Sequence, residues 1–471
     1  MGIPYYFKYL TQKYPRMVSK TCPSVKVDYL FMDCNSIVYD AVKTLNDKVN
    51  DESVITQVIF RIWEYIQKMA PKRVLFIAFD GVAPMSKMQQ QRKRRYKTAA
   101  SAAEATEAWN TTCITPGTPF MEKLSQSVKE AFSHKEREIG VDRILLSTSE
   151  EVGEGEHKLF QWLRQQEPKE SISLWVYGMD ADLIMLSLLH LSHVEKCWVF
   201  REEIKEKGQE KGQEKVQETV YVDILQLGAA IRQEMNLGHA SLREYIFLCF
   251  FLGNDFLPHF PCMNIRTHGI PALLEVYRSI NHHSKNSGFV HLTTGQIQWN
   301  FVKMFLEKCA NCEHEWLLQE YEVRAKLEKY IKLNRKNIEE ILENAPILLR
   351  GVEMYIQPLV LGWQQRYYES LFEPATNAHP VVANYLEGLQ WVHAYYNFGC
   401  PDWRWHYRYA YPPLFADLAK SFHVPKPMIL GKPFTPQEQL AYVMPPTNQK
   451  WEMKYQWSFC RYLWEAHIVV H

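Results

Sequence analysis

The sequence lacks an excess of charge of either sign. Its 54 lysines and arginines nearly balance its 53 aspartates and glutamates, which gives a formal net charge of +1 over 471 residues. With 46% hydrophobic and 23% charged residues, the chain is neither a polycation nor a disordered tail, and its length suits about three domains with a sizeable core. The charge balance does not exclude nucleic acid, because affinity for a polyanion depends on local clusters of cations.

The sequence also lacks a long apolar run and a leader. The longest apolar stretch, Tyr245 to Leu252, ends at Gly253, whereas a helix that spans a bilayer needs about 20 apolar residues. The N-terminal MGIPYYFKYLTQKY has no small-residue cleavage site and carries Lys8 within its apolar part, so no signal peptide is expected. Ten scattered cysteines form no disulfide framework. We therefore expect an intracellular protein without a membrane partner, cytoplasmic or, as the alternative, nuclear.

Short apolar segments alternate with amphipathic segments over roughly the first half of the chain. Strand-like segments lie at 27–34, 74–81, 142–150, 174–182, 197–200 and 220–225, and helical periodicity lies between them, as at 53–70. This alternation predicts an α/β fold with a mostly parallel central sheet flanked by helices. Beyond about residue 285 the apolar spacing turns helical, which predicts a helical C-terminal region.

We divide the chain into three regions on this basis. They are an α/β domain over 1–285, a helical connecting region over 286–374, and a region over 375–471 that is dense in Trp and Tyr. Within the first, the segment KEKGQEKGQEKVQE (205–218) has no apolar residue before Val216. Such a segment cannot pack a core, and we expect a solvated loop between two strands.

Acidic residues follow the ends of the predicted strands. In an open α/β sheet the ligand crevice lies outside the carboxyl ends of the strands, so acids far apart in sequence can converge there. A single acid in such a place is most often a helix N-cap, but two D-x-D or E-x-E pairs plus three further acids favour one shared site. The seven acids are Asp33, Asp80, Glu154, Glu156, Asp180, Asp182 and Asp255.

Seven converging carboxylates would repel one another without cations, and hard oxygen ligands suit Mg²⁺ or Mn²⁺. Two such ions about 4 Å apart are the arrangement for in-line cleavage of a phosphodiester. The sequence therefore predicts a site with two Mg²⁺ ions, for which Mn²⁺ can substitute. His157 directly follows the E-x-E pair, and both a contact with this site and a structural role stay open for it.

A basic helix is predicted directly after Asp80. Between Lys87 and Lys97 there are six cationic residues and no acid. At about 100° per residue, one helical face carries a lysine, a glutamine and two arginines. Arginine supplies bidentate donors to phosphate and lysine a point charge, so beside a metal site this face predicts a phosphate pocket, against the alternatives of a solvated helix or a nuclear-localisation run. Its residues are Lys87, Gln91, Arg94 and Arg95.

At this point the sequence resembles the XRN family of 5′→3′ exoribonucleases. The matching pieces follow one another in family order across nearly the whole chain: MGIPYYFKYL, MDCNSIVYD, FDGVAPMSKMQQQRKRRYK, EEVGEGEHKLF, GMDADLIML, FFLGNDFLPHFP and EGLQWVHAYYNFGCPDWRWHYRYAYPP. The last piece resembles the family's second conserved region, which completes the active site. The resemblance implies a nuclease core like those of PIN domains and flap endonucleases, with the seven acids as catalytic metal ligands.

The resemblance also implies a substrate. It predicts processive hydrolysis of single-stranded RNA from a 5′-monophosphate to nucleoside 5′-monophosphates, with the four residues of the basic face as the 5′-phosphate pocket. We expect a monomer, and a decapping or RNA-processing partner stays unidentified. The chain is much shorter than the large eukaryotic members, which suggests a minimal version without their C-terminal accessory domains, and a viral origin is one interpretation.

One departure from the family concerns the stacking of bases. Family members mostly carry His where this chain has Tyr39, and in the family that ring stacks on a base opposite a Trp. A Tyr ring can also stack. The opposite wall corresponds to the W-x-W of Trp403 and Trp405, of which we favour Trp405.

Two other functions compete with this interpretation. A structure-specific DNA flap endonuclease would carry a glycine-rich helix-hairpin clamp soon after the last acid, and the residues after Asp255 contain no G-x-G hairpin. A non-catalytic RNA-binding protein with the same fold would be expected to have lost acids, and all seven are present.

Overall fold

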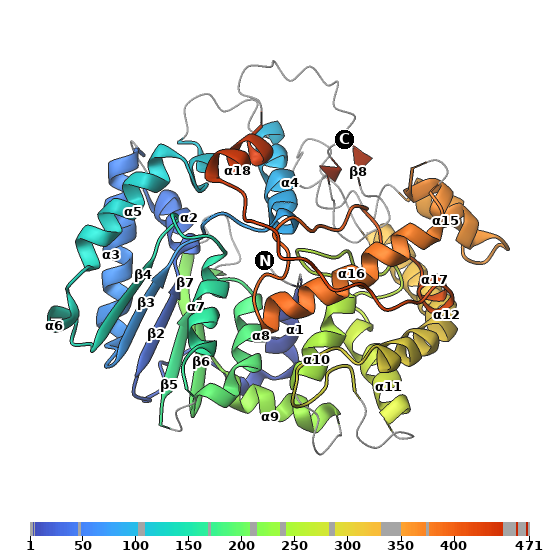
Figure 1. The fold of residues 1–471 in the computed structure, drawn as a ribbon, viewed down its shortest axis with the longest axis horizontal. Coiled ribbons are helices and arrows are strands. Elements are labelled where there is room, and N and C mark those ends of the chain that lie inside the picture. Colours follow the sequence, from blue (N-terminus) through green and yellow to red (C-terminus); the bar gives the residue numbers. More distant parts are fainter. Residues whose placement is uncertain are drawn as a thin grey trace.

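The computed structural model describes residues 3, 5–45, 49–101, 109–167, 171–207, 214–235, 242–281, 288–330, 350–373, 376–445, 458–459 and 468–469. Their central feature is a seven-stranded sheet of order β1-β7-β6-β5-β2-β3-β4 (Figure 1). Neighbouring strands from β6 to β4 pair in parallel, and β7 pairs antiparallel with both β6 and β1. The predicted mostly parallel sheet is therefore confirmed. The strands are β1 (Val18–Ser19), β2 (Tyr29–Asp33), β3 (Val74–Ala78), β4 (Arg143–Ser147), β5 (Ser173–Tyr177), β6 (Lys196–Lys207) and β7 (Glu214–Asp223).

Alternate side chains of the central strands enter two different cores. Leu30 and Met32 of β2 pack with helices on one face of the sheet, whereas Tyr29 and Phe31 pack with helices on the other. This is the two-residue period of a strand that is covered on both sides. The first face is covered by α2 (Asn35–Thr44), α3 (Asp51–Met69) and α5 (Pro119–Phe132), and the second by α7 (Gly155–Arg164), α8 (Asp182–Leu189) and α9 (Ile224–Met235).

Three further helices belong to this part of the chain. They are α1 (Tyr6–Lys13), α4 (Met85–Ser101) and α6 (Glu136–Ile139), and single 3₁₀ turns lie at Pro15–Met17, Thr111–Cys113, Leu191–His193 and Phe250–Leu252. The helix predicted for the basic segment is thus α4, which leaves the end of β3 after a short connection. Along the described part of the chain, no helix combines the length and the apolar character needed to cross a bilayer.

The second half of the described chain is helical, as predicted. Its helices continue the core on the second face of the sheet, where Phe251, Phe305 and Tyr395 belong to one cluster with the residues of β2. The boundaries expected at 285 and 375 thus lie within a shared core. These elements are α10 (Leu242–Cys249), α11 (Gly269–Asn281), α12 (Trp299–Tyr330), α14 (Gly351–Ile356), α15 (Trp363–Leu371), α16 (Ala378–Asn397), α17 (Phe415–Lys420), α18 (Pro436–Val443) and the strand pair β8 (Ser458–Phe459) and β9 (Ile468–Val469).

The segment 205–218 differs from the expected loop. Strand β6 continues to Lys207 and β7 begins at Glu214, so that only 208–213, which lie outside the described residues, separate the two strands. The ladder pairs Glu206 with Lys215 and Lys207 with Glu214. Backbone hydrogen bonds form an antiparallel ladder without any need for apolar side chains. The absence of apolar residues therefore did not exclude strand.

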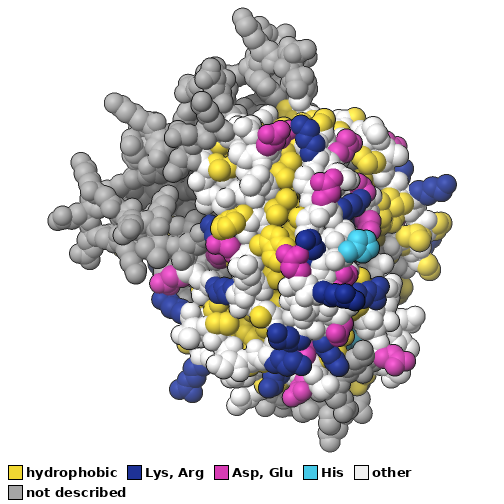
Figure 2. Space-filling model, turned by 90° about the vertical axis from the view of Figure 1, so that its left-hand side faces the viewer, with side chains coloured by type: hydrophobic (Ala, Val, Ile, Leu, Met, Phe, Trp, Pro, Cys, Tyr) yellow, Lys and Arg dark blue, Asp and Glu magenta, His cyan; other side chains and the backbone are white. Residues whose placement is uncertain are grey.

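Charges of both signs are mixed on the side of the molecule that carries α3, α5 and α6. Figure 2 shows Lys and Arg side chains interspersed with Asp and Glu on this face. Exposed ion pairs of this kind contribute at most about 1 kcal/mol each. They include Arg61–Glu64, Lys123–Asp51, Lys129–Glu150 and Lys135–Glu138.

Candidate active site

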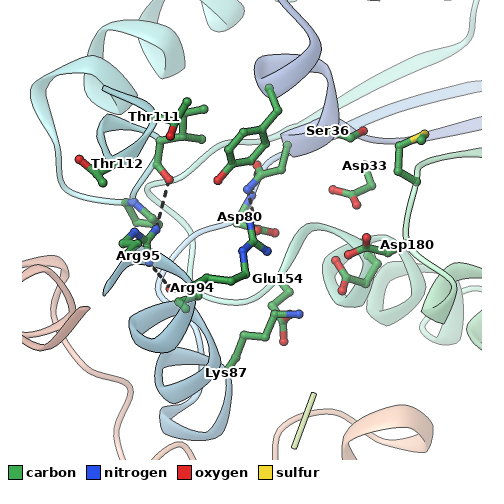
Figure 3. Close-up of a pocket in the computed structure, with 17 residues that line it drawn as sticks. Asp33, Ser36, Asp80, Lys87, Arg94, Arg95, Thr111, Thr112, Glu154 and Asp180 are labelled. Atoms are coloured by element: carbon green, nitrogen blue, oxygen red, sulfur yellow. Dashed lines mark hydrogen bonds and ion pairs between the residues drawn. The ribbon is translucent and has the colours of Figure 1, made fainter. Parts of the chain in front are cut away.

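A cavity of about 210 Å³ lies at the carboxyl ends of the parallel strands, between the sheet and α4 (Figure 3). One side is acidic and the other is formed by the basic helix. Five of the seven predicted acids line it, and so do all four residues predicted for the phosphate pocket. The acids are Asp33, Asp80, Glu154, Glu156 and Asp180, and the helix contributes Lys87, Gln91, Arg94 and Arg95.

The ends of the four neighbouring strands β2, β3, β4 and β5 place the acids. Asp33 is the last residue of β2, and the register pairs it with Ala78 of β3, two residues before Asp80. Glu154 is the N-cap residue of α7, whose first turn contains Glu156. Parallel strands therefore bring acids from separate parts of the chain to one edge of the sheet, as the sequence predicted.

Asp80 is held by three hydrogen bonds that sequence reasoning missed. The Asn35 side chain donates to Asp80 Oδ2 at 2.6 Å, and its carbonyl oxygen accepts from the Asp80 backbone N–H at 2.9 Å. The backbone N–H of Gly155 donates to Asp80 Oδ1 at 2.7 Å. Asn35 stands at the start of α2, two residues after Asp33, and this spacing was the one available signal.

The glycine between the two glutamates has a steric reason. A Cβ at Gly155 would lie 2.5 Å from Asp33 Oδ1 and 3.5 Å from Asp80 Oδ1. Real Cβ atoms do not approach other atoms that closely, so the short E-x-E motif requires glycine at its centre to let the acids converge.

The acids are crowded enough to disfavour their charged forms. Single oxygens of Asp33, Asp80 and Glu156 all lie within 4.8 Å of one another. Burial, with the neighbouring charges of Asp80 and Asp180, raises the pKa of Asp33 well above its usual range. Burial, with the charge of Glu154, does the same to the pKa of Glu156. Like charges that shift one another in this way define a place for cations.

The donor set fits hard divalent cations. Among the described residues, the buried Asp33 Oδ1 has no hydrogen-bond partner, and it lies beside the oxygens of two other carboxylates. A buried carboxylate oxygen without a donor is costly unless a cation or water meets it. Oxygen-only ligands in such a cluster suit Mg²⁺ or Mn²⁺ rather than softer metals.

Asp182 and Asp255 lie outside the cavity lining. Asp182 accepts a hydrogen bond from the Tyr396 hydroxyl at 2.6 Å, and burial raises its pKa to about 7. Asp255 accepts from Lys87 Nζ at 2.8 Å and from Gln90 Nε2 at 2.6 Å. Asp182 is thus held by a residue of α16, and Asp255 shares Lys87 with Glu154, which lines the cavity.

Lys87, predicted as a phosphate ligand, lines the cavity and forms ion pairs with two of the acids. Its Nζ lies 2.5 Å from Glu154 Oε2 and 2.8 Å from Asp255 Oδ2. Burial alone would lower the pKa of Lys87, but the charges of Asp255 and Glu154 outweigh burial and raise this pKa well above its usual range. The lysine therefore remains charged and joins the acidic cluster to the first turn of α4.

The far end of the cavity is formed by the two arginines and the 3₁₀ turn Thr111–Cys113. Arg95 Nη2 donates to Thr115 Oγ1 at 2.7 Å, and burial lowers the pKa of this guanidinium to about 10. Figure 3 shows Arg94 and Arg95 on α4, across the cavity from Asp33 and Asp180. Thr111 and Thr112 also line this end and were not predicted from the sequence.

The residues predicted to stack on bases divide into two groups. Tyr39 lines the cavity beside the arginines. Neither Trp403 nor Trp405 is among the described residues that line it. The Trp405 ring stacks on Trp391 with ring centres 5.4 Å apart, and the Trp403 carbonyl oxygen accepts the N–H of Met85 at the start of α4. Trp405 is therefore packed against a residue of the core. Aromatic-rich segments of this kind serve packing more often than binding.

Comparisons with known proteins point to one family. A family model described as the XRN 5′-3′ exonuclease N-terminus matches residues 1–203, and one described as the Xrn1 helical domain matches 239–348 and 355–457. The 5′-3′ exoribonuclease 2 of Gallus gallus is 26% identical over 95% of this chain and 64% of its own length. The 5′-3′ exoribonuclease 1 of Homo sapiens is 26% identical over 95% of this chain and 31% of its own, and that of Saccharomyces cerevisiae 25% over 95% and 39%.

The chain thus spans between about a third and two thirds of the length of these relatives. Among solved structures, the catalytic core of Rad2 in complex with a DNA substrate matches 83% of this chain and 95% of that chain at 13% identity, with a TM-score of 0.33 that is too low to carry a conclusion. The two family models together cover most of the sequence, in the order in which the α/β and helical parts occur, and the chain belongs to the XRN family of 5′-3′ exonucleases.

Proposed function

We propose that this chain is a 5′→3′ exoribonuclease that hydrolyses 5′-monophosphorylated single-stranded RNA processively to nucleoside 5′-monophosphates. One observation carries the proposal: a single cavity holds five convergent carboxylates at one end and Gln91, Arg94 and Arg95 at the other. Carboxylates with divalent cations serve phosphodiester cleavage, and guanidinium groups beside them serve a terminal phosphate.

Two divalent cations would be held by the acids that line the cavity, with Asp182 and Asp255 supporting them from behind. When bound, such ions supply a hydroxide nucleophile and neutralise the leaving oxygen. The chain's own contribution is to fix the acids: Asn35 and Gly155 orient Asp80, and Lys87 balances part of the charge of Glu154 and Asp255. The scissile phosphate would lie on the acidic side of α4.

The 5′-phosphate would lie at the other end of the same cavity. Arg95 is oriented by Thr115 and by Gln91, whose Oε1 lies 3.4 Å from Arg95 Nη1. Together with Arg94 it can meet a monophosphate with bidentate donors. The backbone carbonyl of Ile114 accepts a hydrogen bond from the same guanidinium at 3.4 Å. We infer that a cavity of about 210 Å³ leaves little room for phosphates beyond the first. A pocket that closes on a chain end selects exonuclease over endonuclease action.

Base stacking is proposed for Tyr39, which lines the cavity beside the phosphate end. The phenol ring can stack on any base, so it would favour no sequence. The role of opposite wall, expected for Trp405 or Trp403, stays a prediction, and the Trp405 ring also stacks on Trp391. A monomer is the proposed working state, and the cytoplasm is the proposed compartment.

The test is hydrolysis with Mg²⁺ of three substrates: single-stranded RNA with a 5′-monophosphate, the same sequence as DNA, and a DNA flap duplex. The proposal expects release of nucleoside 5′-monophosphates from the RNA, with loss of this activity in Asp80→Asn. Preferential cleavage of the flap duplex would instead identify a structure-specific DNA nuclease. Binding of the RNA without hydrolysis would identify a non-catalytic RNA-binding protein.

A further inference from the structure

Two consecutive tyrosines of α16 end on two different acids of the candidate metal site. The Tyr395 hydroxyl donates to Glu154 Oε1 at 2.7 Å, and the Tyr396 hydroxyl donates to Asp182 Oδ1 at 2.6 Å. We infer that Tyr395 and Tyr396 are positioning residues that hold these two carboxylates in the orientation that binds the metal ions. This inference rests on the proposed function and extends it to a helix outside the α/β part of the chain.

The reach of both hydroxyls follows from helix geometry. Neighbouring residues on an α-helix point about 100° apart, so two consecutive side chains can contact different elements. Here those elements are the starts of α7 and α8, since Glu154 directly precedes α7 and Asp182 is the first residue of α8. Figure 1 shows α16 running between the sheet-side helices and the helical half of the molecule.

The two tyrosine rings are held firmly. Both are at most 2% exposed. The His157 ring stacks on Tyr395 with ring centres 3.7 Å apart, and Phe250 meets Tyr396 at 5.3 Å. His157 therefore serves the site indirectly, by fixing the ring whose hydroxyl reaches Glu154. Rings packed on several sides cannot turn their hydroxyls toward other acceptors.

Glu154 is fixed at both of its oxygens. Oε1 accepts from Tyr395, and Oε2 lies 2.5 Å from Lys87 Nζ. Because each oxygen has its own partner, the carboxylate is held in one orientation. The remaining lone pairs of both oxygens then point in fixed directions. Groups that hydrogen-bond a metal ligand in this way orient it, and their loss typically costs about 10- to 100-fold in metal affinity or activity.

This arrangement also explains why the helical half is needed at the site. Six of the seven acids come from the α/β part, and two of these, Glu154 and Asp182, accept from hydroxyls that follow more than 200 residues later in the chain. The same helix carries Trp391, whose Nε1 donates to the Asp402 carbonyl oxygen at 2.8 Å. That loop continues to Trp403, which holds the first turn of α4. Helix α16 thus contacts two acids directly and supports the start of α4 through this loop.

The experiment compares Tyr395→Phe, Tyr396→Phe and the double variant with Tyr277→Phe as the matched control. Tyr277 also donates a buried hydroxyl to a carboxylate, that of Glu244 at 2.9 Å, away from the cavity. Calorimetric titration of each full-length protein with Mn²⁺ alone measures metal affinity without RNA. A second readout is the Mg²⁺ concentration for half-maximal hydrolysis, with KM for RNA measured beside it.

We expect Mn²⁺ affinity to fall about tenfold or more in the double variant and less in each single variant, with KM for RNA within about twofold of wild type. The Tyr277→Phe control should bind Mn²⁺ as wild type does. Equal Mn²⁺ affinity in the double variant, the control and the wild type would overturn the inference while leaving the proposed function intact. A wild-type protein that hydrolyses no RNA and binds no Mn²⁺ would overturn both.

Discussion

The carboxylate of Asp33 lies so close to Gly155 that a Cβ there would stand 2.5 Å from Asp33 Oδ1. The last residue of a strand and the first residue of α7 thus leave no space for any side chain between them. Since the same glycine donates its N–H to Asp80, two acids depend on this one position.

Gly155→Ala should therefore damage the metal site more than the fold. The methyl group must displace the Asp33 carboxylate or the start of α7, so Mn²⁺ affinity and hydrolysis should fall about tenfold or more, while overpacking costs about 1–3 kcal/mol of stability. Calorimetric titration and urea unfolding measure the two effects. Gly351→Ala is the control, because a Cβ there meets nothing within 4 Å. Wild-type Mn²⁺ affinity in Gly155→Ala would contradict the packing argument.

Removing an acid should stabilise the protein when metal is absent. Asp33 is buried beside other carboxylates and its pKa is raised, so its ionisation opposes folding. Asp33→Asn in EDTA should raise the free energy of unfolding by about 1 kcal/mol or more. A raised carboxyl pKa costs more stability as pH rises, so the gain should be larger at pH 8 than at pH 5.

The same variant should lose the stabilisation that Mg²⁺ or Mn²⁺ gives the wild type, because a ligand stabilises only the state that binds it. Thermal unfolding with and without metal checks both signs. A lower stability of Asp33→Asn than of wild type in EDTA would show that repulsion at this site is not the dominant effect.

The sequence predicted those site residues whose place follows from strand geometry. It did not predict those whose place depends on packing between distant elements. The five acids that line the cavity follow strands, and strand ends of a parallel sheet meet by geometry alone. Tyr395 and Tyr396 could not be found in this way, since a buried aromatic segment reads as core whether or not a hydroxyl reaches an acid. Lys87 was assigned to phosphate because it shares a helical face with Gln91, Arg94 and Arg95. Its ion pairs with Glu154 and Asp255 could not be predicted in this way, because those acids belong to other elements.

The fold prediction was confirmed for the parallel strands and wrong for the segment 205–218, also for physical reasons. Continuous apolar runs identified the parallel strands, as at 174–182, because both faces of such strands are buried. The extension of β6 and β7 into 205–218 was missed because its stability comes from backbone pairing with no apolar signal. The substrate role that the resemblance implies for Trp405 stays a prediction, and its ring also stacks on Trp391.

The stability of the helical half should depend on pH through Glu313. This buried carboxylate accepts the backbone N–H groups of Phe415 at 2.7 Å and Ala416 at 3.0 Å, and burial nevertheless raises its pKa to about 7. The folded state then binds more protons than the unfolded state between pH 4.5 and pH 7. The contribution of this group to stability therefore falls as pH rises through that window, by about 3 kcal/mol in total.

Urea unfolding of wild type and Glu313→Gln between pH 4.5 and pH 8 isolates this contribution. The stability advantage of wild type over the variant should shrink as pH rises. Glu315→Gln, at an exposed position of the same helix, should show no such trend. A difference between wild type and Glu313→Gln that is constant with pH would contradict the assigned pKa.

Tyr39 and Trp405 should respond differently to truncation. Tyr39→Ala should weaken RNA binding by about 1–3 kcal/mol on all sequences alike, while Tyr39→Phe keeps the stacking ring and should bind as wild type does. Trp405→Ala should lower the free energy of unfolding by about 2 kcal/mol, because it leaves one face of the buried Trp391 ring without its stacking partner. Fluorescence anisotropy and urea unfolding measure the two quantities. A Trp405→Ala variant that is as stable as wild type but binds RNA weakly would show that this Trp contacts the substrate.

The central claim, that the chain degrades RNA from a 5′-monophosphate, is tested most directly by the rates of decay of RNAs that differ only at the 5′ end. Each hydrogen bond from Arg94 or Arg95 to the charged phosphate should contribute roughly 1.5–3 kcal/mol, so a 5′-hydroxyl RNA should decay at least tenfold more slowly. Arg94→Ala combined with Arg95→Ala should remove this preference without changing Mn²⁺ affinity. Equal decay of phosphate and hydroxyl ends by the wild type, or cleavage of circular RNA, would contradict the proposed 5′→3′ exonuclease.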